Sequence, residues 1–186
     1  MNYIQILKKT WNFIWYDDSL LSWIVNLILA IILVKFIIYP GLGLVLGTDY
    51  PVVAVISESM EHKLNFDNWW ELNKNFYEEN NITKEEFKNY KFKNGFNKGD
   101  IFVVKKGEIK KGDVIVYNNL LQTTPIIHRV VKIEDNIYTT KGDNVAVVQG
   151  FEKNINKEQV FGKAVIKIPY LGWIKVWFND FINKLK

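Results

Sequence analysis

The chain has 186 residues, of which 48% are hydrophobic and 15% aromatic, enough for one compact domain with attachments and for further apolar surface. Its 24 basic and 20 acidic residues give a net charge of +4 and are scattered along the sequence, which argues against nucleic acid as a partner. The absence of cysteine excludes disulfides, thiol catalysis and a cysteine metal site, and two histidines do not favour a zinc site.

A long apolar segment, LLSWIVNLILAIILVKFII, covers residues 20–38 and carries one charge, Lys35. A helix of this length matches the hydrocarbon thickness of a bilayer. A small domain has no core large enough to hide a helix that is apolar on every face. The segment therefore predicts one transmembrane helix.

Basic residues flank this segment unequally. Lys8 and Lys9 precede it, whereas no Lys or Arg stands between Lys35 and Lys63. The positive-inside rule then predicts a single-pass protein of the cell membrane, with residues 1–19 in the cytoplasm and the remainder on the exterior face. The alternative is a cleavable signal peptide, but both the apolar run and the leader before it are longer than usual.

A mostly β exterior domain is expected over residues 40–172, and it begins with a turn at 40–43. Short runs rich in β-branched and aromatic residues are each bounded by Gly, Asn, Asp or Pro, as is typical of such domains. The expected strands are Val52–Ile56, Ile101–Lys105, Val114–Tyr117, Ile126–Ile133, Ile137–Thr140 and Val160–Ile168.

Two segments depart from this β pattern. Residues 61–97 are rich in Asn, Lys, Glu and aromatics, and a capping-box sequence begins at Thr83, so a partly helical insertion is expected to pack on the domain or touch lipid headgroups. Residues 173–186 repeat apolar residues at helical spacing. This predicts an amphipathic C-terminal helix that lies at the membrane interface or docks on the β domain.

Three similar triplets bound the expected strands: Lys98-Gly99-Asp100, Lys111-Gly112-Asp113 and Lys141-Gly142-Asp143. A glycine followed by Asp suits a tight turn for local reasons alone. The repetition therefore counts against assigning chemistry to any one of these aspartates from its local sequence.

Catalytic chemistry is best supported by two serines and a histidine. Ser57 and Ser59 follow the apolar segment, and a serine hydroxyl needs a base within hydrogen-bond reach to act as a nucleophile. His128 shares one face of its strand with Ile126 and Val130, and burial there favours the neutral imidazole, which can accept a proton. His62 borders the polar insertion and is expected to be exposed to solvent.

In combination these features resemble type I signal peptidases of the membrane-bound serine peptidase clan, in the branch found in archaea and the endoplasmic reticulum. The resemblance covers the anchor, Ser57-Glu58-Ser59-Met60-Glu61, the three Lys-Gly-Asp triplets, Ile127-His128-Arg129-Val130 and Asn144, in the family's order. Bacterial relatives have a lysine where His128 stands, so the chain is similar to the Ser-His branch.

The resemblance implies a role for each of these residues. Ser59 is the nucleophile and His128 its general base, while the Ser57 hydroxyl and the Ser59 N–H stabilise the oxyanion. Asp143 falls on the family's Gly-Asp-Asn position and is the candidate for orienting His128. Eukaryotic members have a further aspartate shortly downstream, where this chain reads Val147-Val148-Gln149. The sequence therefore leaves three alternatives for the third catalytic group: Asp143, Glu152, or no third group at all.

The implied function is a membrane-anchored endopeptidase that removes signal peptides from exported preproteins without a metal or organic cofactor. Its expected partners are those signal peptides, the membrane and the protein-export channel. The alternative is a non-catalytic membrane-anchored β domain of a translocation or envelope complex. A self-cleaving, repressor-like peptidase of the same clan is disfavoured, because such enzymes use a lysine base.

Overall fold

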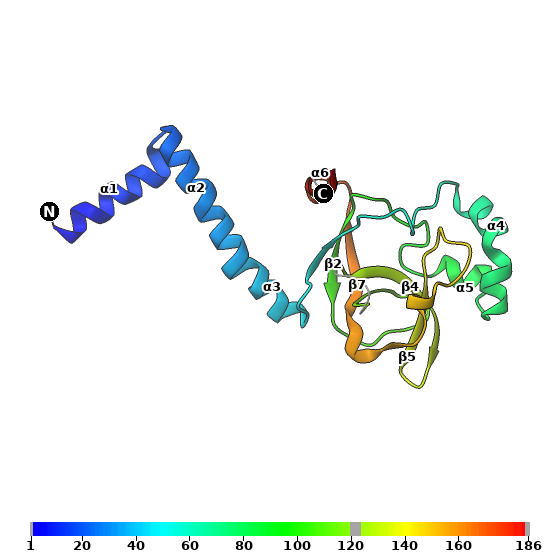
Figure 1. The fold of residues 1–186 in the computed structure, drawn as a ribbon. Coiled ribbons are helices and arrows are strands. Elements are labelled where there is room, and N and C mark those ends of the chain that lie inside the picture. Colours follow the sequence, from blue (N-terminus) through cyan, green and yellow to red (C-terminus); the bar gives the residue numbers. More distant parts are fainter. Residues whose placement is uncertain (1, 120–123, 185–186) are drawn as a thin grey trace. The chain divides into compact units, whose positions relative to one another are not determined.

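The computed structural model describes residues 2–119 and 124–184. The chain forms two compact units, Met1–Val45 and Leu46–Lys186. The first unit is helical and the second is built on a β-sheet (Figure 1). The mostly β fold expected from the sequence is confirmed.

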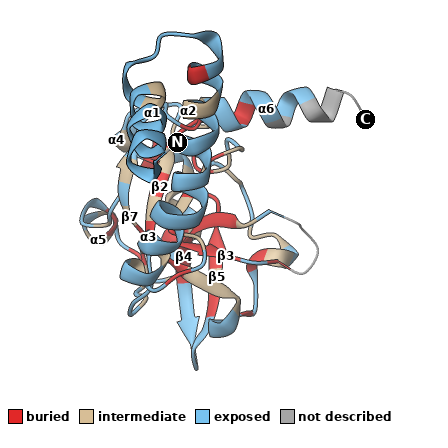
Figure 2. Ribbon diagram, turned by 90° about the vertical axis from the view of Figure 1, so that its left-hand side faces the viewer, coloured by how far each residue is buried: buried red, intermediate tan, exposed pale blue. Residues whose placement is uncertain are grey.

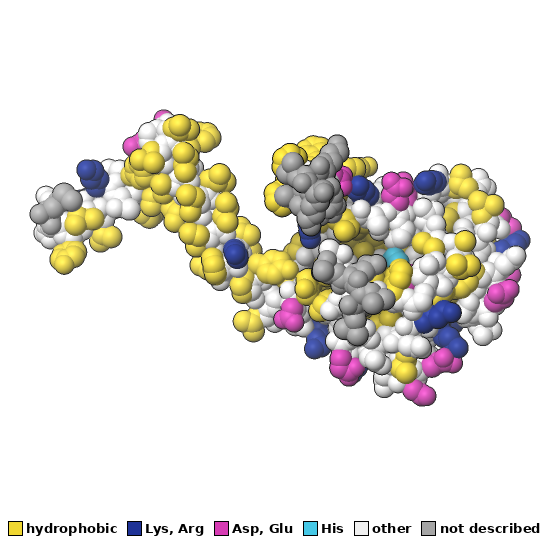
Figure 3. All heavy atoms as spheres, in the orientation of Figure 1, with side chains coloured by type: hydrophobic (Ala, Val, Ile, Leu, Met, Phe, Trp, Pro, Cys, Tyr) yellow, Lys and Arg dark blue, Asp and Glu magenta, His cyan; other side chains and the backbone are white. Residues whose placement is uncertain are grey.

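Four consecutive helical segments follow the N-terminus: α1 (Tyr3–Tyr16), α2 (Leu20–Leu33), a π-helical turn (Val34–Ile38) and α3 (Tyr39–Leu46). The last three form one apolar helix of 27 residues, Leu20–Leu46, long enough to cross a membrane. Its residues are exposed almost throughout (Figure 2), and apolar side chains dominate the face of the helix seen in Figure 3, as expected of a helix surrounded by lipid.

This helix continues through residues 40–43, where the sequence predicts a turn. A proline has no N–H, and its ring clashes with the carbonyl four residues earlier in a regular α-helix. Immediately before Pro40 the backbone forms a π turn, in which the Tyr39 N–H bonds to Val34 O, five residues back. Such a local rearrangement accommodates a proline inside a helix.

The second unit contains an antiparallel seven-stranded sheet in the order β1-β2-β7-β3-β4-β5-β6. Every strand expected from the sequence is present, and a two-residue strand, β6, was not expected. The strands are β1 (Val52–Ala54), β2 (Ile101–Lys105), β3 (Val114–Tyr117), β4 (Ile126–Glu134), β5 (Ile137–Lys141), β6 (Ile155–Asn156) and β7 (Val160–Ile168).

Both faces of the central strands are buried. One cluster includes Phe102, Val104 and Ile127, and the other includes Ile126 and Val130. This alternation along β4 agrees with the predicted faces. It places His128 beside the second cluster, where it pairs with Ile115 of β3.

Residues 61–97 contain α4 (Phe66–Glu79) and α5 (Lys84–Lys88), which lie beside β4, whereas α6 (Trp173–Lys184) lies near β2 and β7 (Figure 1). The expected cap is present, since the Glu86 N–H donates to Thr83 Oγ1 at 3.2 Å. An aromatic cluster attaches this insertion to the sheet. Its buried members are Trp69, Trp70, Tyr77, Ile82, Phe87 and Val131 of β4.

Candidate active site

A serine and a histidine that are far apart in the sequence meet at the loop after β1. Ser59 Oγ lies 2.8 Å from His128 Nε2, so the hydroxyl can donate directly to a neutral imidazole. Ser59 is half-buried and His128 is 6% exposed. The hydroxyl of Ser57, which is exposed, lies 3.1 Å from Ser59 Oγ. The three residues that the sequence associates with nucleophilic chemistry are thus adjacent.

The Ser59 loop is fixed to the chain just after β5. The Asn144 N–H donates to Ser59 O at 2.7 Å, and the Asn144 side chain donates to Glu58 O at 3.0 Å. A Cβ at Gly142 would lie 2.8 Å from Ser59 O and 3.2 Å from His128 Nε2. Glycine is therefore required here because both halves of the site approach its backbone closely.

Glu152 lies on the other side of the imidazole. Its Oε1 is 2.5 Å from His128 Nδ1, a close polar contact that is not aligned as a hydrogen bond. The carboxylate is fully buried and is held by the Gly142 N–H at 2.9 Å and the Gln149 N–H at 2.6 Å. Ser59, His128 and Glu152 thus form a continuous chain of contacts.

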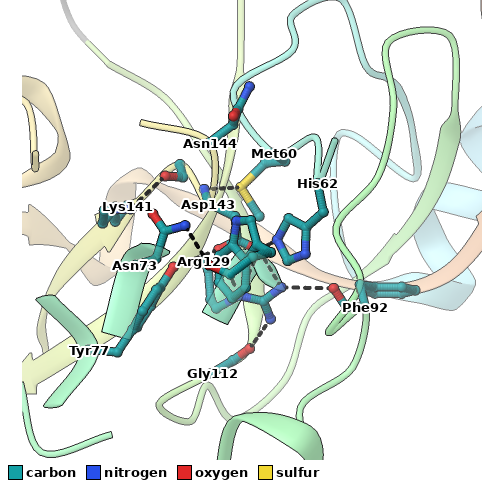
Figure 4. Close-up of polar contacts among 12 residues, drawn as sticks. Met60, His62, Asn73, Tyr77, Phe92, Gly112, Arg129, Lys141, Asp143 and Asn144 are labelled. Atoms are coloured by element: carbon teal, nitrogen blue, oxygen red, sulfur yellow. Dashed lines mark hydrogen bonds and ion pairs between the residues drawn. The ribbon is translucent and has the colours of Figure 1, made fainter. Parts of the chain in front are cut away.

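Asp143 is the other candidate for the third catalytic group, but its carboxylate binds side chains other than that of His128 (Figure 4). Its Oδ2 lies 2.7 Å from Arg129 Nη2 and 3.1 Å from His62 Nε2. The Tyr77 hydroxyl donates to Oδ1 at 3.1 Å. In the described part of the chain, the polar partners of this carboxylate are these three side chains, and His128 is not among them.

The ion pair between Asp143 and Arg129 is completely buried. Burial opposes ionisation of Asp143, but the Arg129 guanidinium and the His62 ring outweigh it and hold the pKa of this carboxyl well below its usual range. Arg129 also donates to the carbonyls of Phe92 and Gly112, at 2.9 and 3.0 Å. A buried pair with so many partners is a structural anchor, and removing one member is costly.

The side chain of His62 is buried, contrary to the exposure expected from its polar surroundings in the sequence. Its side chain is 1% exposed, and its ring stacks on Trp69 of α4 with 3.8 Å between centroids. The insertion folds back on the domain and places this ring against Asp143. His62 and Tyr77 therefore connect the insertion to Asp143, which directly follows Gly142 of the active site.

The three Lys-Gly-Asp triplets differ in the structure. In the first two, the Asp100 and Asp113 carboxylates accept the N–H three residues earlier, each at 3.0 Å, and the preceding glycines have φ of 90° and 89°. These are local turns of the predicted kind. Asp100 and Asp113 also contact lysines of β7. Asp143 binds Arg129, His62 and Tyr77 instead and directly follows Gly142, so it is the third triplet that adjoins the Ser59 loop.

No family model matches the chain. The signal peptidase complex catalytic subunit sec11 of Schizosaccharomyces pombe is 30% identical over 171 residues, covering 87% of this chain and 84% of that protein. Human SEC11C, with the same description, is 26% identical over 157 residues, which span 77% of this chain and 65% of the human protein. SEC11 of Scheffersomyces stipitis is 27% identical and covers 78% and 75%. The chain therefore belongs to the family of signal peptidase complex catalytic subunits.

Proposed function

We propose that Ser59, His128 and Glu152 form the catalytic centre with which this chain cleaves signal peptides from exported preproteins. Membership of the family makes the chain a signal peptidase, a serine endopeptidase. The observation that supports the residue assignment is the 2.8 Å contact between Ser59 Oγ and His128 Nε2. It provides both a nucleophile and the base that this nucleophile needs.

In the proposed reaction, His128 Nε2 takes the proton of Ser59 as Oγ attacks the scissile carbonyl. The negative charge that develops on the carbonyl oxygen is stabilised by the Ser57 hydroxyl and the Ser59 N–H. His128 then gives its proton to the leaving amine, which leaves an acyl-enzyme on Ser59. A water molecule, deprotonated by the same imidazole, hydrolyses the ester and regenerates the serine.

Glu152 is the proposed orienting group. A carboxylate at Nδ1 favours the tautomer that leaves Nε2 free to accept a proton, and it stabilises the imidazolium formed during the reaction. Its contact with Nδ1 and its two backbone N–H bonds support this role. For Asp143, whose carboxylate binds Arg129, we propose a structural role in holding residues 142–144 against the Ser59 loop.

The proposed substrate is an extended segment with small residues at the −1 and −3 positions. In the described sheet, β1 pairs only with β2 and is an edge strand, which leaves backbone groups free to pair with such a segment.

We further propose that the helix Leu20–Leu46 anchors the protein in the cell membrane, with the N-terminus in the cytoplasm and the sheet unit on the exterior face. Lys8 and Lys9 on the N-terminal side support this orientation. Because the named relatives are subunits of a complex, partner subunits and the protein-export channel are proposed partners. A non-catalytic role in such a complex is the alternative.

The proposal is tested with the full chain purified in detergent and a labelled preprotein. The wild type is expected to release the signal peptide and to react with a serine-directed covalent probe. The His128→Ala variant should lose both reactions because Ser59 is no longer activated. If the wild type neither reacts with the probe nor processes any preprotein, the non-catalytic alternative is correct.

A Gly142→Ala variant should react with the same probe at least about tenfold more slowly, because the new methyl group displaces Ser59 or His128. Gly107→Ala is the matched control, since a Cβ there would have no atom within 4 Å. Equal rates for the two variants would show that the close contact at Gly142 does not define the site.

A further inference from the structure

The lysines of the three Lys-Gly-Asp triplets differ in their exposure to solvent. The side chains of Lys98 and Lys111 are 29% and 33% exposed, whereas Lys141, the last residue of β5, is completely buried. Burying an ammonium is costly unless other groups replace the water that it loses. The groups around Lys141 must therefore provide this compensation.

Two aromatic rings of the insertion lie next to the Lys141 ammonium. Its Nζ is 5.0 Å from the centre of the Phe76 ring and 5.3 Å from the centre of the Tyr77 ring, and aromatic faces attract a cation at such distances. Burial lowers the pKa of Lys141, but the carboxylates of Asp143 and Glu152 oppose this effect and favour the charged form. Helix α4 thus provides part of the site that holds a buried cation.

The same ammonium contacts the backbone of the active site. Lys141 Nζ donates to Gly142 O at 3.1 Å (Figure 4), and the Gly142 N–H donates to Glu152 Oε1 at 2.9 Å. Between these two groups, the Gly142 backbone packs closely against Ser59 O and His128 Nε2. A change in the position of Gly142 would therefore alter how Glu152, His128 and Ser59 lie relative to one another.

We propose that Lys141 is a positioning residue for the catalytic centre. Its ammonium, which lies over the aromatic rings of α4, fixes the Gly142 peptide so that the N–H of this peptide points to Glu152. Lys141 acts through Gly142 rather than on the substrate. This role rests on the proposed function, and it makes the insertion a part of the chain that the catalytic centre needs.

The test compares kcat and KM of full-chain variants in the preprotein assay, at a temperature well below every unfolding midpoint. Lys141→Met keeps an unbranched side chain that packs on aromatic rings, but it removes the charge and the donor. We expect kcat to fall about tenfold with KM unchanged, because the Val145 N–H, at 3.0 Å, then holds Gly142 O without help from Lys141. Lys141→Arg retains a cation and a donor, and its kcat should exceed that of Lys141→Met at least about threefold.

Lys111→Met is the matched control. Lys111 is the lysine of the second triplet, and its Nζ donates to Asn81 O of the insertion at 2.8 Å. This contact also attaches the insertion to the domain, but it does not involve Gly142. The kcat of Lys111→Met should therefore stay close to that of the wild type.

Wild-type kcat in Lys141→Met, or a change confined to KM, would overturn the proposal. Equal losses of kcat in Lys141→Met and Lys111→Met would also overturn it, because any weakening of the insertion would then have the same effect. So would equal kcat in Lys141→Met and Lys141→Arg, since the cation would then be unimportant. Ser59→Ala is measured in parallel: if it remains active, the proposed function fails together with the role of Lys141, whereas full activity in Lys141→Met beside an inactive Ser59→Ala removes only the role of Lys141.

Discussion

Replacing Ser59 by alanine is expected to slow preprotein processing by at least about three orders of magnitude, because no acyl-enzyme can form. The substitution removes one oxygen atom at a half-buried position, so the fold and membrane insertion should be unchanged. The measurement is the rate of signal-peptide release from a labelled preprotein, with the amount of inserted protein determined in parallel.

Ser57→Ala is the informative control for this experiment. It leaves the Ser59 Oγ to His128 Nε2 contact in place and removes only the neighbouring hydroxyl. Processing should fall by about 10²-fold, but a serine-directed probe should still label the protein. Full activity in Ser59→Ala, or probe labelling that survives this substitution, would show that another residue is the nucleophile.

Sequence patterns over a few neighbouring residues predicted the helices and strands whose formation depends on those same residues. The strands follow from β-branched runs between turn residues, and the apolar helix follows from its length and composition. Its end at Leu46 was not predicted, because a Pro-Gly pair normally ends a helix and the π turn that accommodates Pro40 has no recognisable sequence signal. Strand β6, with two residues, is too short to give a pattern.

The proximity of Ser59 and His128 was predicted by resemblance, since no spacing rule links residues 69 positions apart. The contacts of His62 and Tyr77 with Asp143 could not be predicted, because they depend on how the insertion folds back on the sheet. Glu152 was one of several open alternatives. Its position next to His128 is created by the short 3-10 turn Gly150–Glu152, which turns the carboxylate inward.

The structure separates the two candidate acids by the kind of damage that their removal should cause. Glu152→Gln keeps the size of the side chain and an oxygen that can accept from a backbone N–H, but it removes the charge beside His128 Nδ1. We expect kcat to fall by about 10²-fold to 10⁴-fold with little change in KM. The midpoint of thermal unfolding should fall less than in Asp143→Asn, because only one of two backbone N–H groups loses its acceptor and no buried charge is left unpaired.

Asp143→Asn should act mainly on stability, because it leaves the Arg129 guanidinium buried without its counter-charge. The free energy of unfolding is expected to fall by about 3–5 kcal/mol. Because the pKa of Asp143 is lowered in the folded protein, its contribution is present above the unfolded pKa of about 4 and is lost as the pH falls below that value. The acid-induced drop in the unfolding midpoint should therefore be smaller in Asp143→Asn than in the wild type.

The kcat values of Glu152→Gln and Asp143→Asn are compared at a temperature well below the unfolding midpoints of both variants, so that kcat is measured on folded protein. If Glu152 orients the imidazole, Asp143→Asn should retain at least about tenfold more activity than Glu152→Gln under these conditions. The reverse order would assign the orienting role to Asp143 and require its carboxylate to leave Arg129 during the reaction. Wild-type kcat in both variants would mean that Ser59 and His128 act as a dyad, and that the buried Glu152 contributes only to holding residues 142–149 in place.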